Sequence, residues 1–203
     1  GFDIGITWHS DEEGAKDTAR EVVSHGVRAE IVQLDLGKLP EGAQALEKLI
    51  QRLGRIDVLV NNFGTSNPRK DLDFAHIDPA VFLDTVNLNL RSVFLASQAA
   101  AKHMAEHGGG SIINISSVGG AVPDISQIAY GTSKAAINYL TKLVAVHEAK
   151  HHIRCNAVMP GMTATEAVER HLTEEFRNLF LRHIPLKRIG LPEEIAEAVV
   201  YFA

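Results

Sequence analysis

The sequence is short of several features, and each shortage excludes a class of protein. It has one cysteine, Cys155, so an internal disulfide framework is excluded and a reducing compartment is favoured. It has no apolar run near the roughly 20 residues needed to span a bilayer, and no signal-peptide pattern, so we expect a cytoplasmic protein without membrane contact. Its formal net charge of −5 gives no basic surface, which argues against a nucleic-acid partner.

What the sequence does contain fits one compact domain over residues 1–203. Hydrophobic residues make up 45% of the chain and charged residues 22%, enough for a substantial core. Strand-like runs cover residues 2–8, 28–34, 56–60, 112–115 and 153–159, and helical patterns cover residues 11–25, 40–53, 79–85, 90–107, 129–150, 173–183 and 192–203. This alternation predicts an α/β fold with a doubly wound, Rossmann-like parallel sheet between two helical layers.

One short stretch combines a hydroxyl, a phenol and an ammonium group. Tyr130 and Lys134 are four residues apart, which on a helix places them on one face with about 6 Å of axial rise. A lysine cation so close would lower the pKa of the phenol from its usual value of about 10. Tyr130 could then exchange a proton with a substrate hydroxyl or carbonyl, and Ser117 could hydrogen-bond the same oxygen. The alternative is an ordinary helix, because Tyr-x-x-x-Lys also occurs by chance.

Polar residues, glycines and a proline also follow the predicted strands, where open α/β sheets bind their ligands. They are Asp35, Asn61, Asn62, Gly64, Pro160 and Gly161. A helix cap at Asp35 and an ordinary turn at Asn61 and Asn62 remain alternatives. Asn89 lies directly before the predicted helix 90–107, and if that helix includes it, its low propensity there hints weakly at a function.

Taken together, these motifs resemble the short-chain dehydrogenase/reductase family. Its catalytic serine precedes its tyrosine by thirteen residues, as Ser117 precedes Tyr130. The resemblance implies hydride transfer between a nicotinamide cofactor and a secondary alcohol or its ketone. Tyr130 would be the acid/base, Lys134 its electrostatic partner and a ribose ligand, and Ser117 would orient the substrate oxygen. Asn89 would hold a water molecule that relays protons.

The same resemblance implies a set of cofactor-binding residues. They are Asp35, Leu36, Asn61, Asn62, Gly64, Tyr130, Lys134, Pro160, Gly161, Thr163, Ala164 and Thr165, with His9 and Ser10 as further candidates. Residues 163–165 would hold the nicotinamide carboxamide, although a threonine helix cap is the structural alternative. The residues after the first strand, His9 and Ser10, include no carboxylate to bind a ribose 2′-hydroxyl, which favours NADP over NAD. The histidines show no metal-ligand motif, so we expect no metal.

Substrate and assembly follow from the resemblance alone. Residues 61–68, 122–130 and 153–161 are similar to bacterial 7α-hydroxysteroid dehydrogenases, which act on bile acids. The alternatives are a general carbonyl or 3-oxoacyl reductase, and a catalytically silent dinucleotide-binding protein. Family members pair through long helices, so we expect a homotetramer. The family's glycine-rich phosphate-binding turn is not in the sequence, so we also expect that the first strand–helix unit and the last strand are missing from this chain.

Overall fold

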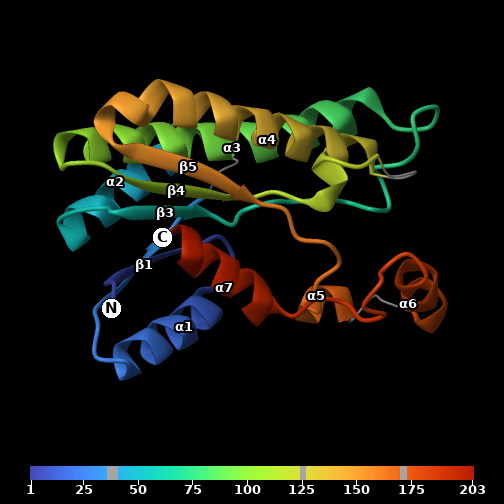
Figure 1. Cartoon of the computed structure of the whole chain (residues 1–203), viewed down its shortest axis with the longest axis horizontal. Coiled ribbons are helices and arrows are strands. Elements are labelled where there is room, and N and C mark those ends of the chain that lie inside the picture. The colour runs from blue at the N-terminus through green and yellow to red at the C-terminus, as the bar shows by residue number, and fades with distance from the viewer. Residues whose placement is uncertain (36–40, 124–126, 170–172) are drawn as a thin grey trace.

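The computed structural model describes residues 1–35, 41–123, 127–169 and 173–203, and within them parallel strands alternate with helices (Figure 1). The strands are β1 (Ile4–Trp8), β2 (Ala29–Gln33), β3 (Val58–Asn61), β4 (Gly110–Ile115) and β5 (Ile153–Val158). The helices are α1 (Glu12–Ser24), α2 (Glu41–Leu53), α3 (Pro79–Glu106), α4 (Ile128–Glu148), α5 (Glu166–Glu169), α6 (Glu174–Leu181) and α7 (Pro192–Phe202), with 3₁₀ turns η1 (Val118–Gly120) and η2 (Ala149–His151). The predicted Rossmann-like α/β fold is confirmed.

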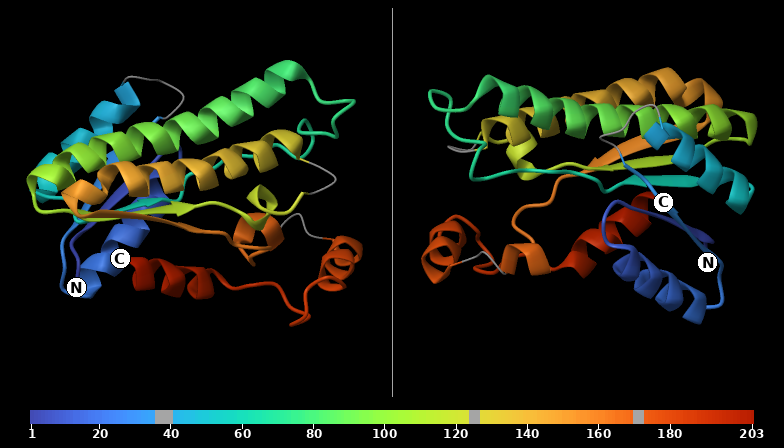
Figure 2. Two further views of the ribbon diagram at one scale, coloured as in Figure 1. Left: turned by 45° about the horizontal axis from the view of Figure 1, so that its top comes forward. Right: turned by 180° about the vertical axis from the view of Figure 1, so that it is seen from behind.

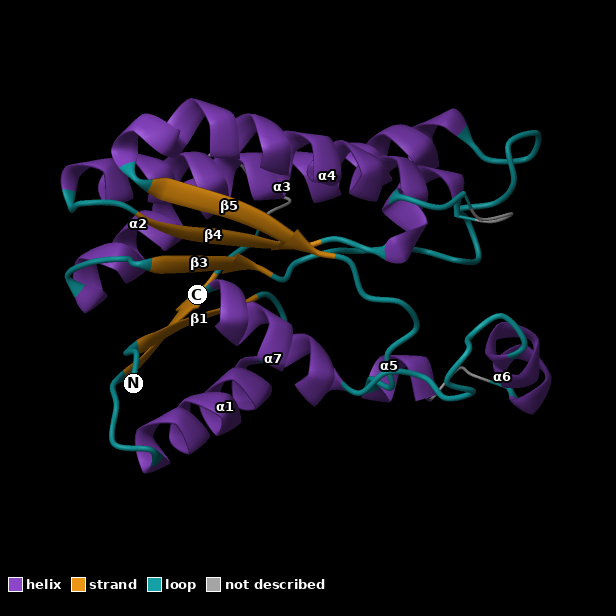
Figure 3. Cartoon of the chain, viewed as in Figure 1, coloured by secondary structure: helices purple, strands orange, loops and turns teal. Residues whose placement is uncertain are grey.

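The helices cover the strands on both sides. Helices α3 and α4 lie side by side over one face of β3, β4 and β5, with α2 next to α3 (Figures 1 and 2). Helices α1 and α7 lie on the opposite face, and α5 and α6 lie beyond the carboxyl ends of the strands (Figure 3). This layering places the loops that follow the strands at one open edge, where a ligand can bind.

The strands form two ladders. Strand β1 pairs with β2, from Ile4 opposite Ala29 onward, and β3, β4 and β5 form a second parallel ladder. We expected one sheet, but in the described part of the chain β1 and β3 do not pair. A cavity of about 850 Å³ lies between them instead, lined by side chains that include Trp8 and Val60.

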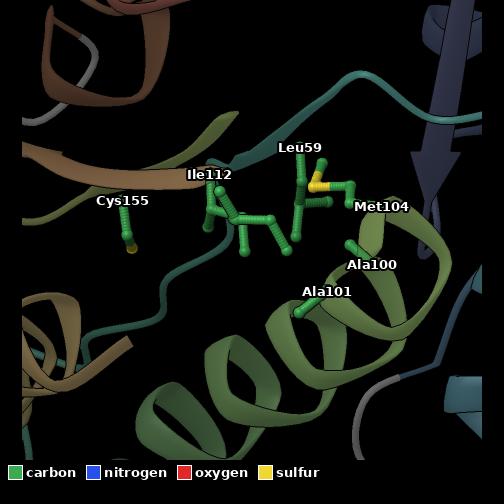
Figure 4. Close-up of a cluster of buried hydrophobic side chains, with 7 residues drawn as sticks. Leu59, Ala100, Ala101, Met104, Ile112 and Cys155 are labelled. Carbon is green, nitrogen blue, oxygen red and sulfur yellow. The ribbon is translucent and has the colours of Figure 1, made fainter. Parts of the chain in front are cut away.

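The core lies between the three-stranded sheet and α3. Leu59 from β3, Ile112 from β4 and Cys155 from β5 pack against Ala100, Ala101 and Met104 of α3, all of them buried (Figure 4). The small alanine side chains let the helix approach the sheet closely. Burial raises the pKa of the Cys155 thiol to about 12, as expected of an unreactive cysteine in an apolar core.

Helix α3 corrects one prediction. The sequence predicted two helices, residues 79–85 and 90–107, but a single helix spans Pro79–Glu106. Asp78 caps its start by accepting a hydrogen bond of 2.8 Å from the amide of Ala80. The helix continues through Asn89 because tertiary hydrogen bonds satisfy that side chain, so its low helix propensity is overridden.

Candidate active site

The predicted catalytic residues meet where β4 ends and α4 begins. Tyr130 is the third residue of α4, and Lys134 follows one turn later. The Lys134 ammonium nitrogen lies 5.6 Å from the centroid of the Tyr130 ring, which is within reach of a cation–π attraction. The helical spacing therefore places the two groups on one face, as predicted.

Lys134 is a buried cation. Its side chain is only 3% exposed, and its ammonium group donates a 2.8 Å hydrogen bond to the carbonyl oxygen of Ile115 at the end of β4. Burial lowers its pKa to about 8, because the charged form loses hydration. At neutral pH most Lys134 side chains still carry their positive charge.

Tyr130 differs from the prediction in one respect. Burial raises the pKa of its phenol, and a hydrogen bond with Ser117 lowers it by a smaller amount. The predicted lowering of this pKa is therefore wrong for this structure, because desolvation outweighs the hydrogen bond with Ser117. At neutral pH the phenol keeps its proton, which is the form that can donate to a carbonyl oxygen.

Ser117 reaches Tyr130 because η1 packs closely on α4. The Ser117 hydroxyl oxygen caps η1 by accepting a 3.1 Å hydrogen bond from the amide of Gly119. At Gly120 a Cβ atom would lie 2.7 Å from the backbone carbonyl carbon of Lys134, closer than real side chains approach. A glycine at position 120 therefore permits the contact that holds Ser117 beside the catalytic helix.

The Asn89 side chain is fully buried and fully hydrogen-bonded. Its oxygen accepts from the Thr65 amide at 2.9 Å, and its nitrogen donates to the Thr65 carbonyl at 2.9 Å and to the Ser133 hydroxyl at 3.0 Å. The Ser133 hydroxyl in turn donates to the carbonyl of Tyr130 at 2.7 Å. Asn89 thus connects the loop after β3 to the catalytic helix, and its role in holding a water molecule remains a prediction.

Two of the residues proposed to bind the cofactor come together. His9 follows β1 and Asp35 follows β2, and the His9 Nε2 atom lies 3.6 Å from a carboxylate oxygen of Asp35. Ser10 is exposed beside them. Leu36 lies outside the described residues.

The Asn-Asn-Phe-Gly run has two different roles. The amide nitrogen of Asn61 is buried and donates to the Ser97 hydroxyl at 3.0 Å and to the Asn114 side-chain oxygen at 2.8 Å, so this residue links β3, β4 and α3. Asn62 is exposed and available to a ligand. At Gly64 a Cβ atom would lie 3.0 Å from the Lys134 nitrogen, so glycine keeps the space beside the ammonium group open.

The segment after β5 is anchored to the site. The Pro160 carbonyl accepts a 2.9 Å hydrogen bond from the amide of Val118, while Gly161 is exposed. Thr163 pairs with Gly190 in an isolated bridge, and the Ala164 amide donates to the Gly190 carbonyl at 2.8 Å.

The hydroxyl of Thr165 caps α5 by accepting a hydrogen bond from the amide of Val168 at 3.3 Å. The helix cap, which the sequence left open as the alternative role of this threonine, is therefore present in the structure. A contact of residues 163–165 with the carboxamide remains a prediction.

Comparison with known proteins identifies the family. The family model described as enoyl-(acyl carrier protein) reductase matches residues 1–203. The chain belongs to the short-chain dehydrogenase/reductase family. This short-chain dehydrogenase acts on CH–OH groups with NAD or NADP.

Relatives named for different substrates, a 7α-hydroxysteroid and acetoin, include proteins of similar identity to this chain, 44% and 45%. It is 55% identical to an uncharacterized oxidoreductase, YohF, of Escherichia coli K12, over 99% of this chain and 78% of the relative. It is 44% identical to a 7α-hydroxysteroid dehydrogenase of Clostridium sardiniense, over 95% of this chain and 73% of the relative. Among solved structures, the acetoin dehydrogenase YohF of Salmonella typhimurium has a TM-score of 0.87 and 45% identity, over 99% of this chain and 78% of that one. A 7α-hydroxysteroid dehydrogenase solved with NADH and 7-oxo glycochenodeoxycholic acid has a TM-score of 0.91 and 29% identity, over 100% and 78% of the two chains.

The site of this dehydrogenase fits the nicotinamide end of a dinucleotide. A buried ammonium group, that of Lys134, lies close to Gly64, and Tyr130 with Ser117 lies next to it. In the described ranges no three His, Cys, Asp or Glu side chains are grouped to hold a metal ion, and no helix is long and apolar enough to cross a membrane.

Sequence reasoning missed three residues that shape this dehydrogenase's site. The Ser116 hydroxyl donates to the Lys134 carbonyl at 3.1 Å, Ser133 holds the Tyr130 carbonyl, and Asp71 binds the start of α4. Ser133 was detectable, since it directly precedes Lys134. Asp71 gave no signal, because a single carboxylate in a polar loop resembles any solvated charge.

Proposed function

We propose that Tyr130 is the acid/base of an alcohol–ketone interconversion, and that Ser117, Lys134 and Asn89 assist it. The proposal rests on one observation, the meeting of Tyr130 with both Ser117 and the buried Lys134 cation at the carboxyl end of β4. Ser117 and Tyr130 would both hydrogen-bond the reacting oxygen, and Lys134 would stabilise negative charge on the phenol. A bound nicotinamide would supply or accept the hydride. Asn89 would keep the Thr65 segment against α4.

For the substrate we propose a 7α-hydroxysteroid. The 44% identity to the Clostridium sardiniense dehydrogenase supports it. Four apolar side chains at the open edge also support it, Val118, Val122, Met159 and Leu179, which are 48%, 60%, 49% and 51% exposed. A flat apolar steroid would cover such side chains. The second candidate is acetoin, favoured by the similarly high identity to the Salmonella typhimurium acetoin dehydrogenase.

For the cofactor we propose NADP. Support comes from His9 and Ser10, which are exposed after β1 where an NAD-binding carboxylate would otherwise stand.

One parallel assay tests both the substrate and the cofactor proposal: a 7α-hydroxy bile acid, its 7β epimer and acetoin, each with NADP and with NAD. Turnover of the 7α compound alone, faster with NADP, is expected. Turnover of acetoin alone would reject the steroid, and dinucleotide binding without any turnover would favour a catalytically silent protein.

The acid/base role is tested by Tyr130→Phe. Removing the hydroxyl is expected to lower kcat by about 10²- to 10⁴-fold while the fold is kept, because only proton exchange is lost. Tyr201→Phe, at a tyrosine that is 83% exposed on α7, is the matched control. Full activity of the Tyr130→Phe enzyme would refute the assignment.

We also propose that the cavity between β1 and β3 receives a further strand and its glycine-rich turn, from a segment outside these 203 residues. The cavity lies between β1 and β3, which do not pair with each other in the ranges that the structure describes, and the chain spans 78% of its Escherichia coli relative. Dinucleotide affinity, measured with and without such a segment, tests this proposal.

We propose a homotetramer that pairs through α3 and α4. The outer face of these helices exposes Phe94, Tyr139, Leu143 and Val146, which are 46%, 64%, 40% and 76% exposed. A shallow cavity of about 470 Å³ lies between the two helices on this face. A second copy would cover this surface.

We place the protein in the cytoplasm, since its one cysteine suits a reducing compartment.

A further inference from the structure

The loop after β3 carries a buried carboxylate that the catalytic set does not include. Asp71 is only 1% exposed, although it lies in a polar loop. A buried carboxylate needs strong hydrogen-bond partners, because desolvation of its charge is costly. Its own amide donates to the Asn67 carbonyl at 2.7 Å, so a local turn fixes its backbone.

The partners of this carboxylate are the first amides of the catalytic helix. One oxygen accepts from the Ala129 amide and the other from the Tyr130 amide, both at 2.9 Å. The Asp71 carbonyl also accepts from the Gln127 amide at 3.3 Å. Asp71 thus binds the start of α4 in a bidentate manner, from 58 residues earlier in the chain.

Among the described residues, which leave out 124–126, helix α4 has no local side-chain cap. Its N-cap, Gln127, is in the left-handed conformation with φ 57° and makes no capping hydrogen bond with its side chain. The first turn of α4 contains no acidic residue. Asp71 therefore provides both the cap and the negative charge that a helix N-terminus favours.

The result is that the backbone of Tyr130 is held on both sides. Asp71 accepts from its amide, and the Ser133 hydroxyl donates to its carbonyl. Ser133 accepts from Asn89, which also binds Thr65 at the start of the same loop. On the basis of the proposed function, we propose that Asp71 is a positioning residue. It holds the start of α4 in place and thereby fixes the Tyr130 hydroxyl against the substrate oxygen.

This role differs from simple helix capping in what it predicts. A cap stabilises the fold, and its loss lowers stability without changing the chemistry of the folded enzyme. A positioning residue sets the geometry of proton transfer, where an error of about 1 Å costs on the order of 10²-fold in rate. The readout that separates the two is kcat of the folded enzyme, measured beside KM for the dinucleotide.

The test compares Asp71→Ala, Asp71→Asn and a matched cap variant, Asp78→Ala. Asp78 caps α3 by accepting a 2.8 Å hydrogen bond from the Ala80 amide, and no hydrogen bond within the described ranges joins its side chain to the proposed catalytic set. We expect Asp71→Ala to lower kcat by about 10- to 100-fold with little change in KM for the dinucleotide. Asp71→Asn, which keeps one acceptor oxygen, should fall between it and the unmodified enzyme. Asp78→Ala should lower the melting temperature and leave kcat unchanged.

Two outcomes would overturn the proposal. One is an Asp71→Ala enzyme that melts earlier, as Asp78→Ala does, but keeps its kcat within about two-fold. The other, decisive if Asp71→Ala does not fold, is an Asp71→Asn enzyme with unchanged kcat. Tyr130→Phe is measured in parallel, so that the two proposals fail separately. An active Tyr130→Phe enzyme rejects the acid/base assignment of Tyr130. An inactive Tyr130→Phe enzyme, together with fully active Asp71 variants, rejects only the positioning role of Asp71.

Discussion

At the scale of single residues, burial sets the proton affinity of Tyr130 and Lys134, the two ionisable groups of the proposed catalytic set. Desolvation raises the pKa of the Tyr130 phenol and lowers that of Lys134 to about 8. Both shifts favour the neutral form of each group. The site therefore holds a protonated phenol beside a lysine cation whose pKa is lowered. In this state the phenol can donate a proton to a carbonyl oxygen.

The buried charge of Lys134 predicts a pH-dependent stability difference. Its pKa is about 10.5 in the unfolded chain and about 8 in the folded one, so between these values the unfolded chain binds more protons. The contribution of Lys134 to the free energy of unfolding is therefore least favourable below pH 8 and improves as the pH rises towards 10.5. Lys134→Met removes this cost, so we expect the variant to gain stability relative to the unmodified protein at pH 7 and to lose that advantage near pH 10.

Urea unfolding of both proteins at the two pH values measures the difference. Lys142→Met, at an exposed lysine on the same helix, controls for the loss of a lysine. A difference between Lys134→Met and the unmodified protein that stays constant with pH would contradict the assigned pKa shift.

At the scale of elements, the site depends on how closely η1 approaches α4. Gly120 lies against the backbone of Lys134 and Ala135, and its carbonyl accepts a 3.2 Å hydrogen bond from the Asn138 amide group. Because η1 begins directly after Ser117, any shift of η1 away from α4 also moves Ser117 from Tyr130. Stability and catalytic geometry are thus coupled through this one contact.

Gly120→Ala is expected to destabilise the fold by about 1–3 kcal/mol, because its methyl group would overlap backbone atoms that cannot move independently. The same change should reduce kcat by displacing Ser117. Gly161→Ala is the control for stability, since a Cβ atom there would meet no atom within 4 Å. Denaturant midpoints of both variants give the comparison, and equal stability of the two would show that η1 has room to move.

At the scale of the whole molecule, two surfaces are suited to further contacts: the strand edges between the two ladders and the exposed face of the helices α3 and α4. The edges of β1 and β3 face a common cavity, and the outer side of α3 and α4 carries apolar side chains in a row. Tyr139, Leu143 and Val146 have the i, i+4, i+7 spacing of one helical stripe. Such a stripe is suited to a helix of a second copy.

Val146→Glu tests the proposed pairing. A charge in the middle of an apolar interface is costly, so we expect a smaller mass by light scattering than for the unmodified protein. Val23→Glu, the same substitution at an exposed valine of α1 on the opposite side of the sheet, should leave the mass unchanged. Equal masses for both variants and the unmodified protein would place the subunit contact elsewhere.

The sequence by itself determined the local features. Alternating apolar runs and helical periods indicated the order of strands and helices, and the four-residue spacing placed Tyr130 and Lys134 on one face. These predictions succeeded because they depend on backbone periodicity, which a sequence carries directly. The prediction of two helices, 79–85 and 90–107, in place of α3 failed for the opposite reason, since a buried hydrogen-bond network around Asn89 overrode local propensity.

Only the tertiary structure decided the rest. The direction of the Tyr130 pKa depends on how deeply the phenol is buried, and burial is a property of packing between distant segments. Asp71 caps α4 from 58 residues away, and the separation of β1 from β3 depends on how the two ladders lie in space. Contacts at such sequence distances leave no periodic pattern to read. They arise only when the chain has folded and its loops meet at the edge of the sheet.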